Sequence, residues 1–263
     1  MKEMNLSQVR QVQVELLRHF SQVCEKHKLT WFLSNGTLLG AVKYKGFIPW
    51  DDDVDVCMPR KDYDRLLQLY EGTEAYRLMS FDEDYRFHFE KLADMRTKLV
   101  EKNPLCREIG VNIDVFPLDN FGNSKEDAEV LFSKAEKLRR RLNWSKLSCY
   151  TSATWMKAVA KWLYALPYKV FGPAYFAGKI MALAADTENG SAYMGNLIWG
   201  FYGAGEAHLA EVFAESTPVL FEGEQYPAPV GYDSYLRGLY GDYEKDPPKE
   251  KQVTHHCYEA YFR

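Results

Sequence analysis

The sequence predicts an α+β fold: a mixed sheet flanked by helices, with a helical subdomain inserted before the C-terminal segment. Residues 7–25 carry apolar side chains at helical spacing, and residues 76–117 contain short apolar runs separated by turn-forming residues. From residue 124 the helical spacing returns. We therefore expect a core over residues 1–122, a helical subdomain over residues 123–215, and a segment over residues 216–263 that returns to the core.

Composition excludes several classes of protein. The chain has 263 residues, 46% of them hydrophobic, which is enough for a sizeable core. A net charge of −4 argues against a nucleic-acid binder, and five cysteines without a Cys-x-x-Cys pair indicate neither a disulfide framework nor a zinc site. The start lacks an apolar signal segment, and the longest apolar stretch, residues 170–185, is shorter than the ~20 residues that span a bilayer. We expect a cytoplasmic protein, soluble or peripheral at the inner face of the membrane.

The first elements lead to a short helix. The amphipathic helix over residues 7–25 belongs to the core, and Trp31 to Leu33 form a buried strand. Asn35-Gly36-Thr37 then open a brief apolar helix over residues 38–42. Gly-Thr at a helix start offers unpaired backbone N–H groups to an anion, although an ordinary turn with an N-cap is the default for Gly-Thr alone.

Four aspartates follow within five positions, between an apolar run and an apolar strand: Asp51, Asp52, Asp53 and Asp55. Residues two apart in a strand share a face, so Asp53 and Asp55 are expected to point the same way. Two carboxylates on one face repel each other unless a cation lies between them. Oxygen ligands with open positions left over suit Mg²⁺ or Mn²⁺. For an isolated Asp-x-Asp, a solvated acidic turn is the alternative.

A helix is expected from Pro59 to about Tyr70, with Arg60 and Lys61 at its start, where a solvated helix terminus is favoured over phosphate contact. Four strands then follow: YRLMSF, FHFEKLA, TKLVEK and GVNIDVFPL. The spacing predicts a helix and then a strand over residues 191–221, and a short helix over residues 235–243.

The last of the four strands contains one acid that needs an explanation. Asp114 lies between Ile113 and Val115 in a run typical of a buried strand, where an unpaired carboxylate is costly. A shared cation with the earlier aspartates explains it, and a salt bridge to a neighbour such as Lys91 is the alternative. Asp119 is expected at a turn.

The run GTLLGAVKYKGFIPWDDDVDV resembles the signature of the LicD family of phosphotransferases, which includes the fukutin-related proteins. The run YLRGLYGDYEKDPPKEKQVTHH is similar to the C-terminal pattern of this family, so the resemblance covers nearly the whole chain. Thr37 stands where the wider nucleotidyltransferase superfamily usually has Ser or Gly, and the gap to Asp53 is slightly longer than usual there. The resemblance implies a nucleotidyltransferase-like fold. It also implies transfer of phosphocholine, or a related phosphoalcohol, from a CDP-linked donor such as CDP-choline to a sugar of a cell-surface glycan or lipid-linked teichoic acid precursor.

This resemblance assigns roles to particular residues. Asp53, Asp55 and Asp114 would be the catalytic carboxylates that hold Mg²⁺ or Mn²⁺. The remaining candidates would contact substrate: Gly36 and Thr37 at the diphosphate, Lys91 and, more weakly, Arg96 near the phosphates, and Trp50 as a wall for the choline ammonium. Strand alternation places Lys91 on the same face as aromatic residues, so its aliphatic stem could equally extend along apolar surface without phosphate contact. For Trp50, simple packing is an equal alternative to choline contact.

The helical subdomain is basic within an acidic protein. Residues 125–179 contain eleven lysines and arginines against four acidic residues, a net charge of +7, with aromatic residues interleaved. This pattern fits peripheral contact with an anionic membrane that presents a lipid-linked acceptor, or equally the solvated face of a helical bundle. Adjacent His255 and His256 are a poor metal pair and are expected, like His88, to be structural.

Three other functions stay open. A nucleotide-sugar glycosyltransferase or a nucleotidyltransferase would use the same Asp-x-Asp metal site. A non-catalytic binder of wall polymers would keep the fold and lose the metal, and the three intact carboxylates argue against it.

Overall fold

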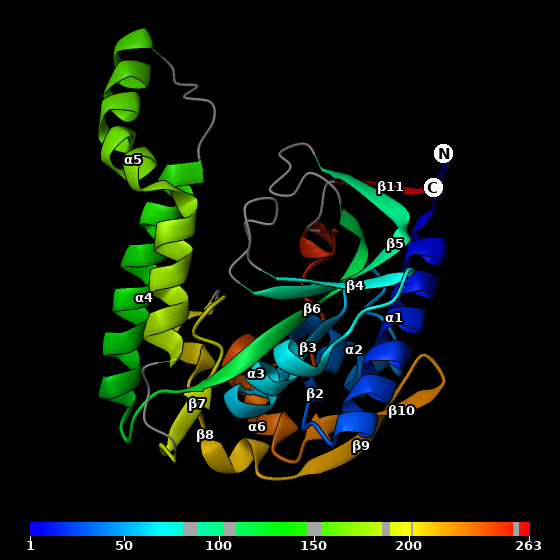
Figure 1. The fold of residues 1–263 in the computed structure, drawn as a ribbon. Coiled ribbons are helices and arrows are strands. Elements are labelled where there is room, and N and C mark those ends of the chain that lie inside the picture. The colour runs from blue at the N-terminus through cyan, green and yellow to red at the C-terminus, as the bar shows by residue number, and fades with distance from the viewer. Residues whose placement is uncertain (81–88, 102–108, 147–153, 186–189, 201, 255–257) are drawn as a thin grey trace.

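A computed structural model describes residues 1–80, 89–101, 109–146, 154–185, 190–200, 202–254 and 258–263. Figure 1 shows a curved sheet wrapped by helices, a helical hairpin standing beside it, and the two termini close together at one edge of the sheet. The expected α+β class is confirmed.

The core is a nine-stranded sheet in which β3 and β6 run parallel and the other neighbours run antiparallel. The main path is, in order, β1 (Lys2–Glu3), β11 (Tyr258–Phe262), β5 (Glu90–Glu101), β6 (Ile109–Asn120), β3 (Asp55–Pro59) and β2 (Phe32–Leu33). Three further strands join it: β4 (Tyr76–Met79) on β5, β7 (Tyr193–Gly195) on β6, and β8 (His208–Leu209) on β7.

Helix α1 (Leu6–His27) packs its apolar face on β5 and β6. It begins at a capping box, in which Asn5 accepts from the Gln8 N–H and the Gln8 side chain accepts from the Asn5 N–H. The remaining elements of the core are α2 (Asn35–Tyr44), α3 (Arg60–Leu69), α6 (Tyr232–Tyr240), the hairpin β9 (Ser216–Phe221) and β10 (Glu224–Pro229), and the 3₁₀ turns η1 (Gly203–Glu206), η2 (Ala210–Phe213) and η3 (Lys249–Lys251).

Helices α4 (Lys125–Lys146) and α5 (Trp155–Ala185) form the hairpin that we call the helical arm. Gly172 interrupts α5 with φ 75° and ψ 165°. A positive φ favours glycine, and Pro173 follows directly. The arm therefore consists of an inner part that packs against α4 and an outer part, residues 155–171, that extends to the free end of the hairpin (Figure 1).

Three expectations about elements were wrong. Residues 191–221 contain no α-helix in their described part, only the short elements β7, η1, β8 and η2, whereas the strand expected to follow is present as β9. The last helix is Tyr232–Tyr240, three residues earlier than expected. The expected second and third strands are one, β5, which continues through a register shift between Asp94 and Leu99. Among the described residues, no helix is both long and apolar enough to cross a bilayer.

Candidate functional site

Three charged side chains lie in a row across the central strands of the sheet. Asp55 begins β3 and is paired in register with Asp114 on the parallel strand β6. Asp114 is in turn paired with Lys91 on β5. Residues paired in register on neighbouring strands point to the same face, so the structure brings Lys91, Asp114 and Asp55 together.

The backbone around Asp55 is fixed by three hydrogen bonds. Its N–H donates to the Thr37 Oγ1 at 2.8 Å, and its carbonyl accepts from the Ser34 N–H at 3.1 Å. The Asp114 N–H donates to the Val54 carbonyl at 2.8 Å. The hydroxyl of Thr37 thus positions the strand that carries the carboxylate, at the point where α2 begins.

The Asp55 carboxyl is buried, and this burial raises its pKa well above the ordinary value. The charges of Asp53, Asp114 and Asp51 raise the pKa further, and a hydrogen bond from Asn35 lowers it. Three further carboxylates thus act on that of Asp55 at the start of β3. A cation at this place would relieve their repulsion.

Asp53 itself lies outside the strand. β3 begins at Asp55, and residues 51–54 have no regular secondary structure, so strand alternation does not place Asp53 as the sequence suggested. Its position is set instead by the loop, from which its charge acts on Asp55 more strongly than that of any other neighbour.

Lys91 forms an ion pair with Asp114, the alternative that the sequence left open. Its ammonium also donates to the Asn112 Oδ1 at 3.2 Å and lies 5.3 Å from the centre of the Phe89 ring. Both side chains of the pair are largely buried, with 14% of Lys91 and 17% of Asp114 exposed. The pair gives this face of the sheet a fixed positive group beside the carboxylates.

The carboxylate oxygens of Asp53, Asp55 and Asp114 are of the kind that Mg²⁺ and Mn²⁺ prefer. The described residues, however, contain no cluster of three or more Asp, Glu, His or Cys side chains close enough to hold a metal ion. The carboxylate oxygens are ligands of the right type, but the three side chains do not lie close enough together in this structure. Asp114 is moreover paired with Lys91. The metal assignment stays a prediction.

The start of α2 faces a carboxylate. Ser34 precedes the helix without a side-chain cap, and a Cβ placed on Gly36 would lie 2.6 Å from the Asp51 Oδ2. Only glycine allows so close an approach of this acid to the helix N-terminus, where the macrodipole favours negative charge. Asn35, at φ 46°, exchanges hydrogen bonds with the Tyr235 hydroxyl of α6, which fixes the turn that precedes Gly36 and Thr37.

Two residues of α1 that the sequence analysis missed hold the loop of aspartates. The guanidinium of Arg10 donates to the carbonyls of Ile48, Pro49 and Asp51 at 2.5–3.1 Å. The Gln13 Nε2 donates to the Asp52 carbonyl at 2.9 Å. Helical periodicity marked only the apolar face of α1, and nothing in the spacing showed that its polar residues reach this loop.

Trp50 lies at the end of the same loop, half-buried, with its ring at 76° to that of Tyr44 and 6.4 Å between the ring centres. The Tyr44 hydroxyl donates to Asp246 at 2.5 Å, and the Lys43 ammonium contacts the same carboxylate at 2.6 Å. The two rings thus form a corner, with the Lys43 ammonium and the Asp246 carboxylate at its edge. Of the two rings, the sequence pointed only to Trp50.

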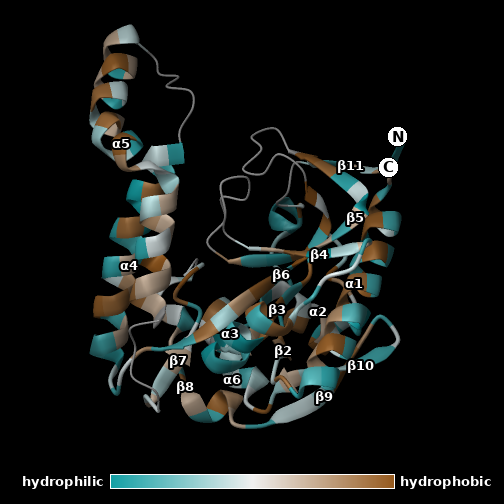
Figure 2. Cartoon of the chain, in the orientation of Figure 1, coloured by the Kyte–Doolittle hydropathy of each residue, from teal (hydrophilic) through white to brown (hydrophobic). Residues whose placement is uncertain are grey.

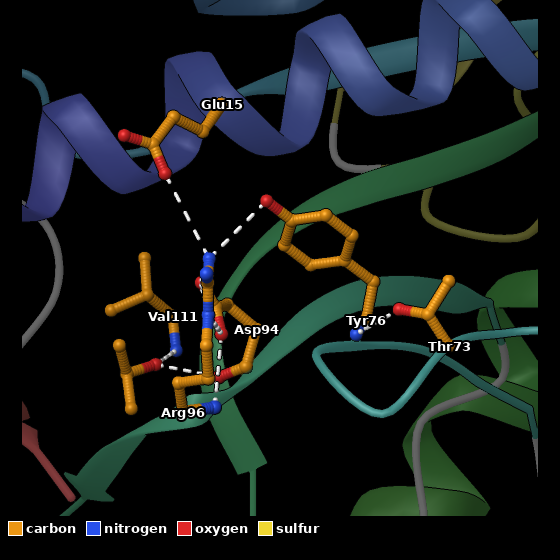
Figure 3. A network of polar contacts seen from close by, with 7 residues as sticks. Glu15, Thr73, Tyr76, Asp94, Arg96 and Val111 are labelled. Carbon is orange, nitrogen blue, oxygen red and sulfur yellow. Dashed lines mark hydrogen bonds and ion pairs between the residues drawn. The ribbon is translucent and has the colours of Figure 1, made fainter.

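Arg96 is engaged elsewhere (Figure 3). Its guanidinium contacts both carboxylate oxygens of the buried Asp94, at 2.6 and 3.0 Å, donates to the Tyr76 hydroxyl at 3.2 Å, and lies 3.8 Å from Glu15 of α1. These contacts lie toward helix α1, and the structure does not join Arg96 to the row of Lys91, Asp114 and Asp55. Arg96 also lies within β5 at the register shift, not at a turn.

The expected roles of Arg60 and Asp119 were wrong. Asp119 lies inside β6 and is fully buried, and the Arg60 guanidinium contacts it at 2.6 Å. Burial raises the pKa of the Asp119 carboxyl to about 7 in spite of Arg60, and it raises the pKa of nearby Glu90 to about 7. Arg60 therefore neutralises buried acids and is not a solvated helix terminus.

Behind the site lie tyrosines of η1 and α6 that the sequence analysis did not assign. Burial raises the pKa of Tyr202 to about 12, with a smaller contribution from the Asp55 charge, and raises those of Tyr235 and Tyr240 in the same direction. The Tyr202 and Tyr240 rings meet edge to face at 5.3 Å. Tyr235 and Tyr240 fall within the C-terminal run that resembles the family pattern. His88, His255 and His256 lie outside the described residues, as do Cys106, Cys149 and Cys257, whereas Cys24 and Cys57 are buried and free.

Comparison with known proteins places this geometry in a family. Residues 28–146, which include the row of charged residues and the start of α2, match the family described as LicD/FKTN/FKRP, nucleotidyltransferase domain. The chain is 31% identical over 274 residues to the lipopolysaccharide cholinephosphotransferase LicD of Haemophilus influenzae, an alignment that covers 99% of each protein. An uncharacterized protein of Rickettsia prowazekii is 29% identical over 90 residues, 34% of each chain. Similarity along the whole chain to the Haemophilus protein, together with the match over the site, shows that this protein belongs to the LicD family.

Proposed function

We propose that the chain transfers phosphocholine, or a related phosphoalcohol, from a CDP-linked donor to a sugar hydroxyl of a cell-surface glycan or of a lipid-linked teichoic acid precursor. The observation that carries the proposal is the row of Lys91, Asp114 and Asp55 beside the start of α2. It is supported by end-to-end similarity to a lipopolysaccharide cholinephosphotransferase.

With CDP-choline as donor, the acceptor oxygen attacks the phosphorus that carries choline. A new phosphorus–oxygen bond forms, the bond from that phosphorus to the bridging oxygen breaks, and CMP leaves with the electron pair and that oxygen. Lys91 would place positive charge beside the diphosphate, and the first turn of α2 at Gly36 and Thr37 would orient it. An ionised Asp55 or Asp114 would take the proton of the acceptor hydroxyl.

Mg²⁺ or Mn²⁺ would be held by Asp53, Asp55 and Asp114, and would supply positive charge against the negative charge that develops on the departing CMP. The corner formed by Trp50 and Tyr44 would receive the quaternary ammonium of choline on its ring faces. A phosphoalcohol without a cationic end would gain nothing from this corner.

Phosphorus NMR tests the proposal by showing which bond breaks. The protein is incubated with CDP-choline, an amino-sugar acceptor and Mg²⁺, with Asp55→Asn as the matched inactive control. We expect CMP and a phosphodiester resonance on the sugar, both absent without divalent cation. Turnover of a nucleotide-sugar, with release of a nucleoside diphosphate and no phosphorus on the acceptor, would contradict the proposal and indicate glycosyl transfer at the same aspartates.

A further inference from the structure

The outer part of α5 exposes large apolar side chains. Trp155 is 76% exposed and Val170 is 78% exposed, values far outside those of the core. Met156, Trp162, Leu163 and Phe171 are likewise exposed. Figure 2 shows hydrophobic bands alternating with hydrophilic ones along the free end of the arm. Contiguous exposed apolar surface of this kind marks an interaction site.

The apolar residues form one face of the helix. Trp155, Val159, Trp162 and Leu166 follow one another at spacings of four, three and four, which keeps them on a single side of an α-helix. Met156, Leu163 and Val170 repeat every seven residues directly beside them. Lys157 and Lys161 lie on the opposite side, together with Tyr164, whose ring packs against Trp144 of α4. The outer helix is therefore amphipathic, with its apolar face turned away from α4.

The helical arm has an excess of positive charge, and beyond Glu136 its charge is of one sign. Residues 137–185 contain nine lysines and arginines and no aspartate or glutamate, within a protein of net charge −4. A groove of about 610 Å³ between the two helices is lined by Lys134, Lys137, Arg141 and Lys179, with Leu138 and Leu183 as apolar neighbours. Such a groove suits anionic groups.

We propose that the helical arm docks on a lipid bilayer with anionic head groups, with the apolar face of residues 155–171 lying in the boundary between head groups and acyl chains. A basic amphipathic helix with tryptophan on its apolar side is the composition that lies in this boundary. The kink at Gly172 and the lack of a spanning helix among the described residues agree with a helix that lies on the bilayer. A second copy of the chain is a poorer occupant, because two arms would bring positive charges together.

Vesicle flotation tests the docking without using turnover. The probes are vesicles of phosphatidylcholine alone and vesicles that contain phosphatidylglycerol. We expect binding only to the anionic vesicles, and loss of that binding as salt rises and screens the charges. Fluorescence of Trp155 and Trp162 should shift to the blue on binding.

Two variants separate the charge from the apolar face. Lys157→Glu with Lys179→Glu should weaken binding at least about thirtyfold, since each basic residue near an anionic surface contributes about a factor of five and each new glutamate adds repulsion. Trp155→Ser with Trp162→Ser should weaken it at least about tenfold. The first control, Lys249→Glu with Lys251→Glu, makes the same charge reversals at exposed positions of the core. The second, Val230→Ser with Val253→Ser, replaces two exposed apolar side chains of the core by serine. All four proteins should keep their circular dichroism spectrum.

The proposal fails if the protein does not float with anionic vesicles, if binding is independent of salt, or if the core controls weaken it as much as the arm variants. It also fails if the Trp155 and Trp162 variant abolishes a concentration-dependent dimer while vesicle binding stays unchanged, because the face then belongs to a second copy. The arm variants should transfer phosphocholine to a soluble sugar at the normal rate. Failure of docking and failure of the proposed activity are therefore distinguishable.

Discussion

The sheet core and the helical arm both place charged groups among aromatic and apolar residues, but they do so in opposite surroundings. In the core, Asp55, Asp114 and Lys91 project from buried strands, and register fixes each one beside the next. In the arm, the lysines are exposed and follow the helical period. Burying a charge costs free energy, so a single buried charge implies a partner nearby. An exposed charge costs little, so only a long excess of one sign indicates a binding partner.

The largest expected effect comes from Asp55→Asn, which tests whether the buried carboxylate of Asp55 serves catalysis. The amide has the same shape and cannot serve as an anionic ligand or base. We expect turnover to fall at least about 10³-fold, the size of effect seen when a key electrostatic group is removed. The melting temperature should stay the same or rise, because burial and three neighbouring carboxylates disfavour the charged form of Asp55.

Asp242→Asn is the matched control, since Asp242 is an exposed carboxylate paired with Lys245 at the surface. Its turnover should equal that of the unaltered protein. Normal turnover in Asp55→Asn, measured with donor in excess, would show that the row of charges is structural.

A smaller loss is expected for Lys91→Met, which keeps the length of the side chain and its contact with Phe89 but removes the ammonium. Asp114 then loses its ion-pair partner, and the site loses its fixed positive group. We expect kcat/KM to fall about 10- to 100-fold, as for loss of one cationic group at a transferring phosphoryl. Lys91→Arg should recover part of it. Lys98→Met on the same strand is the control, and an equal loss there would argue against a role for this ammonium.

Arg96→Ala separates structure from substrate binding at a residue that the sequence assigned to the phosphates. Asp94 is 1% exposed and would lose both contacts with the guanidinium, while Arg96 itself is half exposed and its charge is partly screened. We expect the free energy of unfolding in urea to fall by about 1–2 kcal/mol. A KM for the donor that rises in the fully folded variant would support the sequence-based role, and an unchanged KM would limit Arg96 to holding Asp94.

The last effect is on the pH dependence of stability and concerns Glu206, a buried acid away from the row. Burial raises its pKa to about 8 in the folded protein, above its value in the unfolded chain, so the folded state holds the proton more tightly. Its contribution to stability is fully present below about pH 4 and is lost as pH rises toward 8, by at most about 1.4 kcal/mol per pH unit. Urea unfolding across this range should therefore give a flatter profile for Glu206→Gln, but not for exposed Glu211→Gln.

The sequence predicted the parts of the site that lie close together along the chain. The start of α2 and the aspartates up to Asp55 form one continuous stretch, and periodicity placed a strand directly after it. Asp114 could be selected because an acid between Ile113 and Val115 contradicts a buried strand. The strand register that sets Asp114 beside Asp55 belongs to the folded sheet and could not be predicted from the residue pattern.

The contacts that the sequence did not reveal join residues far apart. Asp119 was expected at a turn because its partner, Arg60, lies 59 positions earlier. A break was expected between the strands FHFEKLA and TKLVEK because β5 shifts register there, where the Thr97 hydroxyl donates to the Asp94 carbonyl and accepts from the Val111 N–H. A turn and a bulge have similar local signatures, and only the neighbouring strand distinguishes them.

The carbonyl of Asp52 accepts from Gln13 of α1 and also from the Tyr258 hydroxyl at 3.2 Å, in the strand β11 that follows all other strands. During synthesis, the aspartates therefore leave the ribosome about two hundred residues before the side chain that completes their support. Until then, the contacts from Arg10 and Gln13 of α1 are the ones that can hold the loop. The last contact to this loop thus forms together with the pairing of β11 on β5, so the support of the aspartates and the closure of the sheet are joined in one strand.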